Sequence, residues 1–367
     1  MLFTGREVKE LTDANERARA GSVVARPPEL QKREEADFAP SPPLATSAKR
    51  PAEKLRWSTL LAVPFTGVAA LALHGFATAS QSPAEALLYT YFLIGLLIAA
   101  LIAVAVQPVW SGLRKWMRDS FPLIAAAVSC LVVWELVTSV LHWLPLPYFP
   151  GPSGVLSSLV NDGAVLFDST WHSLLLLLGG YTLGVAAGLV SGICIGWFPH
   201  ARYWGMPILK IVGPIPATAW IPLAMVLSPS AMFSAIGLIG LAVWFPVTML
   251  TASGVSNTRA SYLDVARTLG AGRAYLIFNV AIPAAMPSIF IGLFMGLGAS
   301  FLTLVVAETV GVKSGLGWYV SWAQGWAEYG KVYAALLIMA AFFSTIMTAL
   351  FKVRDRVLAW QKGVIKW

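Results

Sequence analysis

The chain has 367 residues, of which 57% are hydrophobic and only 12% are charged, and its formal net charge is +8. Because a soluble domain carries roughly 25% charged residues, this composition excludes an ordinary soluble protein and predicts an all-α, polytopic membrane protein. The basic residues are scattered between apolar runs, which argues against a nucleic-acid-binding patch and is typical of cytoplasmic loops. The expected surroundings are therefore a lipid bilayer, with no nucleic acid as a partner.

Residues 1–56 differ in composition from the rest of the chain. They contain half of the acidic residues and eleven Lys or Arg, with prolines clustered at 27–28 and 40–43. No long apolar run occurs there, which predicts a cytoplasmic, largely disordered tail. Thr4 and Glu7 fit a capping box, so a helical docking element is the alternative to a solvated tail.

Two apolar runs, 57–78 and 86–106, are joined by a short turn that contains no Lys or Arg, whereas basic residues follow at 114–118. This pattern predicts a transmembrane hairpin, residues 57–110, that enters and leaves on the cytoplasmic side. The main transmembrane domain is then expected over residues 111–367. Further straight spans are expected at 121–143, 171–197, 232–252, 285–310 and 331–351.

The distribution of Lys and Arg also predicts the topology of the main domain. The loop 144–169 has no Lys or Arg and is expected outside, as is the loop 311–330 despite Lys313. Basic residues around Arg202, around Arg267 and after residue 351 mark cytoplasmic segments. Both termini are therefore expected in the cytoplasm.

Two of the apolar stretches carry distinctive patterns. Glycines recur every four residues at positions 184, 188, 192 and 196, which predicts a close-packing helix face, with packing inside one subunit as the simplest explanation. Four prolines at 207, 214, 216 and 222 interrupt another stretch. Such a stretch cannot form a straight helix, and in a membrane it is tolerated only when it is buried in protein or lines a cavity.

The loop 254–284 is the most patterned segment. Tyr262–Leu269 predicts a helix, Gly270-Ala271-Gly272 ends it, and Arg273–Val280 predicts a second helix that Pro283 and Pro287 separate from the next span. Ala266 and Gly270 lie four residues apart on the face that carries Tyr262, so a shallow groove beside a bulky ring is expected. The alternative is a cytoplasmic loop with accidental glycines.

This loop resembles the EAA loop of ABC-importer permeases, which forms the coupling helix that docks into an ATP-binding subunit. Asp264 stands for the motif's Glu and Val265 for its first Ala, which are both conservative departures. The resemblance implies an ATPase-coupling loop containing Asp264, Val265, Ala266, Gly270, Ala271, Ile282 and Pro283.

Three other stretches resemble signatures of one subfamily, the nitrate, aliphatic sulfonate, taurine and bicarbonate permeases. They are GPIPATAWIP at 213–222, VAETVGVKSGLG at 306–317 and FPGPSGVL at 149–156. Gly213 occupies a position where arginine is usual. The resemblance covers residues 121–351 and leaves residues 1–110 unexplained.

The resemblance implies a type I ABC importer transmembrane domain of about six core helices, preceded here by a two-helix extension. Its implied partners are two ABC ATPase subunits, a second and identical permease copy, and an extracytoplasmic substrate-binding protein, in the inner membrane of a bacterium. The implied cargo is a small oxyanion or a sulfonate-type organic anion. The sequence contains no G-x-x-x-x-G-K-[ST] phosphate loop, since Val332 follows Gly330-Lys331. No cofactor is expected in this chain, because the partner ATPase would bind ATP and Mg.

The polar residues inside the spans suggest a weakly binding pathway. No Lys or Arg lies mid-span between 121 and 351, so the available donors are hydroxyls and indoles, which suits a low-affinity conduit. The candidate pathway residues are Pro216, Thr218, Trp220, Pro222, Thr248, Ser300, Thr303 and Glu308. Glu135 and Glu308 lie in or near apolar runs, and for both a structural role is favoured over a pathway role. Glu308 is expected to accept hydrogen bonds from amides of the following glycine-rich loop.

Two other classes of protein remain as alternatives. An ion-coupled secondary transporter predicts internal repeats and paired broken helices, but the sequence has one proline-broken stretch and no repeat. A membrane-embedded enzyme predicts a polar catalytic cluster, and none is recognisable. The four histidines are far apart, and Cys130 and Cys194 lie inside apolar runs, so neither a metal site nor a catalytic role is expected.

Overall fold

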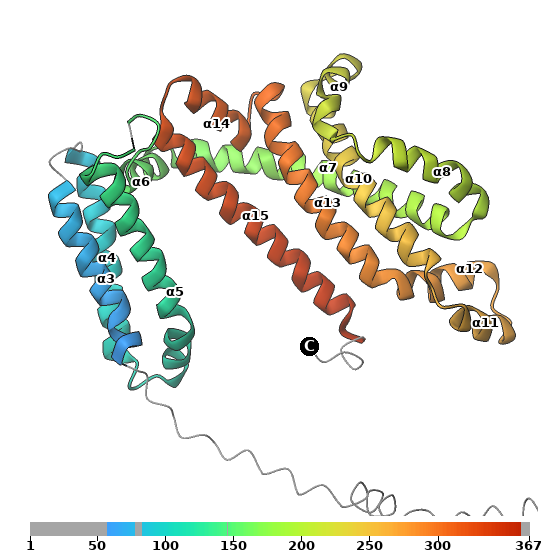
Figure 1. The fold of residues 1–367 in the computed structure, drawn as a ribbon, viewed down its shortest axis with the longest axis horizontal. Coiled ribbons are helices and arrows are strands. Elements are labelled where there is room, and N and C mark those ends of the chain that lie inside the picture. Colours follow the sequence, from blue (N-terminus) through green and yellow to red (C-terminus); the bar gives the residue numbers. More distant parts are fainter. Residues whose placement is uncertain (1–56, 78–82, 145, 361–367) are drawn as a thin grey trace, which may run out of the picture. The chain divides into compact units, whose positions relative to one another are not determined.

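The computed structural model describes residues 57–77, 83–144 and 146–360, and the predicted tail, residues 1–56, lies outside this range. The described residues belong to one compact unit, Arg56–Trp367. Every regular element among them is a helix (Figure 1). The predicted all-α membrane fold is therefore confirmed for the part of the chain that the structure describes.

Seven stretches of the described chain are long and apolar enough to cross a bilayer. They are α3 (Trp57–Ala77), α4 (Pro83–Val106), α5 (Ser111–Glu135) with its π-helical continuation η2 (Leu136–Val140), α7 (Gly163–Trp197), α10 (Ala231–Ser256), α13 (Ile282–Val310) and α15 (Tyr329–Val357). Two shorter helices replace parts of the predicted outer loops. These are α6 (Pro152–Asn161), which starts with proline in its first turn, and α14 (Leu316–Gly325).

The proline-rich stretch is broken, as the sequence predicts. α8 (Pro199–Val212) is followed by the 3₁₀ helix η3 (Ala217–Trp220) and by α9 (Ile221–Leu227), and the two halves are bent by 85°. Pro216 has extended backbone angles at the break. Gly213 packs against the ring of Phe245, where an added Cβ would collide. A side chain at position 213 would therefore require Phe245 to move.

The centre of the fold is the packing of α7 along α10, which also packs along α13. Gly184, Gly188 and Gly192 are buried on the α7 face that meets α10. A Cβ at Gly184 would lie 2.5 Å from the carbonyl oxygen of Gly240, and one at Gly192 would lie 2.8 Å from that of Thr248. The glycine repeat is thus a backbone-to-backbone packing face within one chain, and the prediction is confirmed.

Substituting Gly184 by leucine should lower the stability of the purified protein by about 1–3 kcal/mol, because the side chain would meet the α10 backbone, which cannot rotate away. The measurement is the midpoint of unfolding in detergent. Gly237→Leu on α10 is the matched control, since a Cβ there meets nothing within 4 Å. Equal midpoints for the two variants would contradict this packing.

The two helices of the predicted extension, α3 and α4, pack on each other and on the helices that follow. α3 contacts α4 and α5, and α4 contacts α6. His74 of α3 lies 2.5 Å from Glu135 of α5 through Nδ1, and its Nε2 lies 3.1 Å from the carbonyl oxygen of Ala86. Both side chains are buried, with 2% and 0% of their surfaces exposed. The carboxylate of Glu135 is therefore held structurally by a residue of the extension.

Candidate functional site

The loop between α10 and α13 begins with α11 (Ala260–Thr268), which ends at Gly270 with φ +85°. The amide of Gly270 donates to the carbonyl of Arg267, and the amide of Ala271 donates to that of Ala266. This pair of bonds is the Schellman motif, which satisfies the last carbonyls of a helix and favours glycine at the left-handed position. The predicted glycine stop is confirmed.

The second part of the loop differs from the prediction. α12 (Arg273–Tyr275) continues through the π-helix η4 (Leu276–Ala281) directly into α13. The expected separation at Pro283 and Pro287 is wrong. Pro283 directly follows the π-helical turn η4, and Pro287 is accommodated inside α13. The loop is therefore rigidly continuous with a membrane span.

A groove of about 610 Å³ lies between the two arms of this loop. Val265, Leu269 and Tyr275 line it and are 61%, 82% and 55% exposed. Its lining comprises Tyr262, Val265, Ala266, Leu269, Gly270, Ala271, Gly272, Tyr275, Asn279 and Val280. An exposed apolar hollow of this kind is typical of an interaction surface.

The residues predicted for coupling are only partly brought together. Val265, Ala266, Gly270 and Ala271 line the groove. The exposed carboxylate of Asp264 instead lies 2.9 Å from the guanidinium of Arg267, one helical turn away. Ile282 packs beside a buried cluster of α10 and α13, and Pro283 follows it in the same first turn. Ile282-Pro283 thus fixes where the loop enters the membrane helix.

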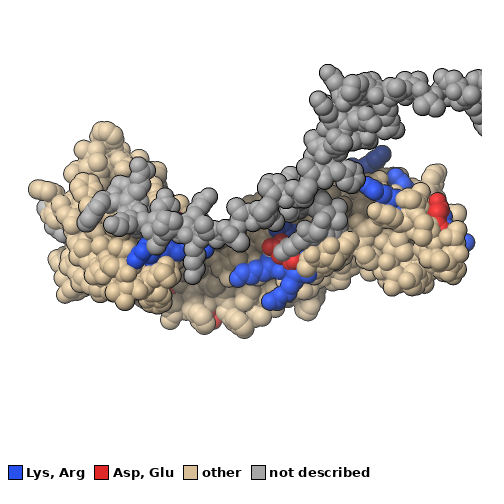
Figure 2. Space-filling view, turned by 90° about the horizontal axis from the view of Figure 1, so that it is seen from below, with Lys and Arg blue, Asp and Glu red and all other residues tan. Residues whose placement is uncertain are grey.

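The surface around the groove carries a positive charge. Arg259, Arg267 and Arg273 lie in or beside α11 and α12, against the single carboxylate of Asp264. The helices α11 and α12 lie low in the view of Figure 1. Figure 2 shows the molecule from below that view, and more Lys and Arg than Asp and Glu are visible on this face. This distribution agrees with a cytoplasmic position for the loop.

A second cavity, of about 360 Å³, lies beside the break between α8 and η3. Pro216, Thr218 and Thr303, all predicted for the pathway, line it together. The other lining residues are glycine and apolar side chains: Val212, Gly213, Ile215, Ala217, Leu241, Ala242, Phe245, Pro246, Met295, Ala299 and Leu302. Thr218 and Thr303 are thus its hydroxyl-bearing lining residues, of which Thr303 donates its hydroxyl to the carbonyl of Ala299 at 3.0 Å, and no lining residue is charged.

The other candidate pathway residues lie elsewhere. Thr248 is buried between α7 and α10, with its hydroxyl 2.8 Å from that of Ser191, which also accepts the indole N–H of Trp244. The buried Ser300 donates to the carbonyl of Leu297. Trp220 and Pro222 flank Ile221 at the start of α9. The indole N–H of Trp220 is buried and has no partner among the described residues, and Pro222 is exposed.

Glu308 holds the turn after α13. Its carboxylate accepts the amide of Gly317 at 2.7 Å and the hydroxyl of Ser173 at 2.6 Å, and Ser173 in turn accepts the amide of Leu316 at 2.9 Å. Gly315 has φ +109°, and a Cβ there would collide with the carboxylate. The carboxylate and the glycines of VAETVGVKSGLG therefore form one structural clamp, and the expected hydrogen bond from the loop is present.

Substituting Gly317 by alanine should destabilise the protein by about 1–3 kcal/mol, because the new Cβ would lie 2.5 Å from the carbonyl oxygen of Val305 and would displace the amide that Glu308 accepts. The midpoint of thermal unfolding checks this expectation. Gly325→Ala, near the end of the same short helix, is the control, because its Cβ would meet nothing. A midpoint for Gly317→Ala no lower than the control's would refute the clamp.

Sequence reasoning missed two sets of residues. His74 was treated as an isolated histidine, although it is the partner of Glu135. A buried carboxylate in a membrane span requires a partner, so a search for a titratable group on the neighbouring spans could have found it. Ser191 and Trp244, which contact each other beside Thr248, had no comparable signal.

The chain is similar to a known protein family and to a solved structure. Residues 180–359 match the model of the family described as "Binding-protein-dependent transport system inner membrane component". The inward-facing MetNI methionine ABC transporter is similar with a TM-score of 0.47 and 16% identity, over 54% of this chain and 98% of the transporter chain.

Three curated relatives are similar over most of their own length. A probable ABC transporter permease protein of Haemophilus influenzae is 31% identical over 60% of this chain and 89% of the relative. The taurine transport system permease TauC of Escherichia coli is 30% identical, over 64% and 87%. The bicarbonate transport system permease CmpB of Synechococcus elongatus is 27% identical, over 70% and 94%. The chain therefore belongs to the inner-membrane components of binding-protein-dependent transport systems, and it is the permease of an ABC importer.

Proposed function

We propose that two identical copies of this chain form the membrane channel of a type I importer. Two separate ATPase subunits bind ATP and Mg below them, and a substrate-binding protein delivers cargo from outside. ATP-driven closure of the ATPases moves the loop of α11 and α12, and the continuous helix from Arg273 to Val310 carries that movement into the membrane. The chain acts by biasing two conformations and needs no catalytic group of its own.

The observation that carries this proposal is the exposed apolar groove around Gly270. Leu269 lines the groove and is 82% exposed, so no described residue of this chain buries it. A neighbouring subunit that fills the groove would remove this apolar surface from water, which favours association. The positive charge of the surrounding arginines suits an acidic rim on that subunit.

The proposed orientation places α11, α12 and both chain termini in the cytoplasm. Single cysteines introduced at 267 and at 148, after replacement of Cys130 and Cys194 by serine, should then label oppositely with an impermeant reagent added outside intact cells. Position 148 should react and position 267 should react only after permeabilisation. Labelling of position 267 from outside would overturn the orientation.

For the cargo, we propose a small oxyanion or a sulfonate-type organic anion, the class to which the taurine and bicarbonate systems of the relatives point. The cavity at Pro216, Thr218 and Thr303 supports weak binding, because two hydroxyls and no cation line it. Affinity and selectivity then reside in the external binding protein, and this chain is a low-affinity conduit. Micromolar affinity of the permease–ATPase complex for the cargo, without the binding protein, would refute this part.

The function is tested by reconstituting the permease, its ATPase and its binding protein in liposomes and measuring uptake of labelled taurine, bicarbonate and nitrate. Uptake that requires ATP and the binding protein is the expected result. Uptake driven by an ion gradient without ATP would instead identify an ion-coupled transporter.

A further inference from the structure

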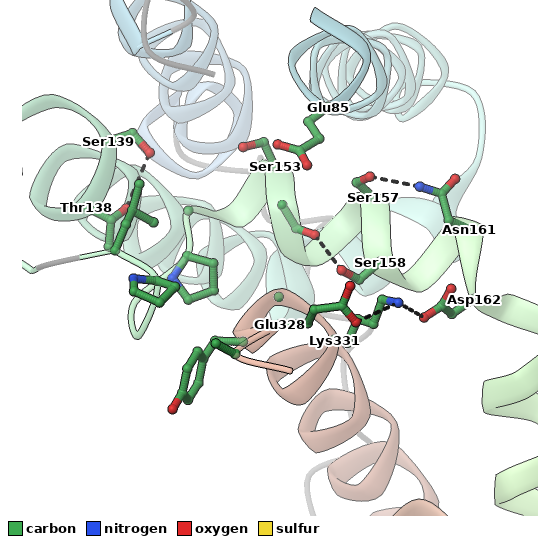
Figure 3. Close-up of a pocket in the computed structure, with 18 of the residues that line it drawn as sticks. Glu85, Thr138, Ser139, Ser153, Ser157, Ser158, Asn161, Asp162, Glu328 and Lys331 are labelled. Carbon is green, nitrogen blue, oxygen red and sulfur yellow. Dashed lines mark hydrogen bonds and ion pairs between the residues drawn. The ribbon is translucent and has the colours of Figure 1, made fainter. Parts of the chain in front are cut away.

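A third pocket, of about 530 Å³, lies where the extension meets α6 and the start of α15. Glu85 comes from α4, Thr138 and Ser139 from η2, several serines from α6, and Glu328 and Lys331 from the start of α15 (Figure 3). The pocket shares no lining residue with the coupling groove or with the cavity at Pro216. Its volume falls within the roughly 300–1,000 Å³ typical of small-molecule sites.

The pocket carries more negative than positive charge. Its lining holds three carboxylates, those of Glu85, Asp162 and Glu328, and one lysine. The ammonium group of Lys331 already forms ion pairs with two of them, since its Nζ lies 3.3 Å from the carboxylate of Asp162 and 2.9 Å from that of Glu328. Glu85, by contrast, makes no ion pair or hydrogen bond with any residue that the structure describes, and no dashed line reaches it in Figure 3. Glu85 is therefore the carboxylate of this pocket that has no charged partner among the described residues, and it lies in the first turn of α4.

Asp162 also accepts a hydrogen bond of 2.6 Å from the phenol of Tyr319. Burial, together with the neighbouring Asp162 carboxylate, raises the pKa of Tyr319, so the phenol stays protonated and remains a donor. The polar side chains on this side of the pocket therefore bind one another: Lys331 pairs with Asp162 and Glu328, and Tyr319 donates to Asp162. Glu85 takes no part in these contacts.

Ser153 provides an independent sign of a ligand. It lines the pocket near the N-terminus of α6, is only 2% exposed, and makes no hydrogen bond within the described part of the chain. Its hydroxyl is reached from the pocket and can accept a hydrogen bond from a group bound there. A bound group that hydrogen-bonds Ser153 beside a negative charge would satisfy both residues.

The chemistry favours an organic cation over a metal ion. In the described residues, no group of three or more His, Cys, Asp or Glu side chains could hold a metal. A primary ammonium group carries three N–H donors, which match one carboxylate and one or more hydroxyl oxygens. We propose that this pocket binds a primary ammonium group, of a free small amine or of an ethanolamine lipid headgroup, with Glu85 as counter-charge and Ser153 as acceptor. This inference is independent of the proposed transport function.

The first test uses the full-length chain in detergent and ligand-observed NMR with ethanolamine. A ligand of this size should bind with a Kd on the order of 1 mM. Glu85→Gln should weaken binding by roughly tenfold or more, because it removes the charge from a charge-assisted hydrogen bond, and Ser153→Ala should weaken it to a lesser degree. Asp168→Asn is the control, since it removes one negative charge outside the pocket and should change nothing. Ethanol and choline, which lack the ammonium N–H donors, should not compete.

The second arm distinguishes the two sources of the group. Native mass spectrometry of the same proteins should detect retained phosphatidylethanolamine, in preference to phosphatidylcholine, if a lipid headgroup fills the pocket. Binding of free ethanolamine without retained lipid identifies a soluble amine. Whichever of the two signals is seen, ethanolamine binding or lipid retention, must fall in Glu85→Gln. Absence of both signals, or equal signals in wild type, Glu85→Gln and Ser153→Ala, would overturn the proposal.

Discussion

Replacing His74 by leucine should destabilise the protein by about 3–5 kcal/mol, the cost expected when one partner of a buried pair is removed. Nδ1 of His74 lies 2.5 Å from Glu135, and both side chains are almost fully buried. The variant would remove the imidazole from a carboxylate that is 0% exposed. The free energy of unfolding is measured by titrating the purified protein with a denaturing detergent, and the midpoints of the variants are compared.

A double variant separates this pair from general packing. His74→Leu combined with Glu135→Leu should recover most of the lost stability, because two apolar side chains replace the pair without leaving a buried charge. His172→Leu is the matched control, since that histidine is 43% exposed beside Asp168 and its loss should shift the midpoint little. If His74→Leu were as stable as the control, the extension would not be fixed to α5 through Glu135.

Replacing Leu269 by aspartate should reduce ATP-dependent uptake by roughly tenfold or more while leaving the fold intact. Leu269 is 82% exposed in the isolated chain, so the substitution costs the permease itself almost nothing. In the proposed complex, the same side chain enters an apolar contact with the ATPase, where a carboxylate would be buried without a partner. Uptake in liposomes should therefore fall while the unfolding midpoint stays unchanged.

Gly270→Trp is the second variant for the same surface, because it would fill the groove and also force tryptophan to φ +85°. Val353→Asp, at a 52% exposed position near the end of α15, is the control for placing a carboxylate on an exposed apolar site. Normal uptake by Leu269→Asp, or an equal loss in Val353→Asp, would remove the groove from the coupling mechanism.

Local backbone chemistry explains which features the sequence could predict. The glycine repeat of α7, the break around Pro216 and the stop at Gly270 each depend on one residue type with a strong conformational or steric preference. Those preferences act before tertiary packing does, so they can be read from a single chain. Glu308 was also predictable, since a carboxylate in an apolar helix needs donors and a glycine-rich turn supplies amides.

The failures have a different physical origin. Pro283 and Pro287 are predicted to end a helix, but the chain continues as a helix through a π-helical turn just before Pro283. Thr248 and Ser300 were candidates for the pathway because they carry hydroxyls, yet their placement depends on which helix face meets a neighbour. The pairing of His74 with Glu135 joins residues 61 positions apart, which no local pattern reveals.

Site-specific photocrosslinking can show whether the α11–α12 loop of this permease contacts an ATPase. A photoreactive amino acid at position 269 should form an adduct with a subunit that contains a G-x-x-x-x-G-K-[ST] motif, identified by mass spectrometry. The same probe at position 226, which is also 82% exposed but lies on α9, should form no such adduct. The account predicts an adduct whose yield changes with ATP at position 269. Failure to capture an ATPase there, while an active transporter is assembled, would contradict it.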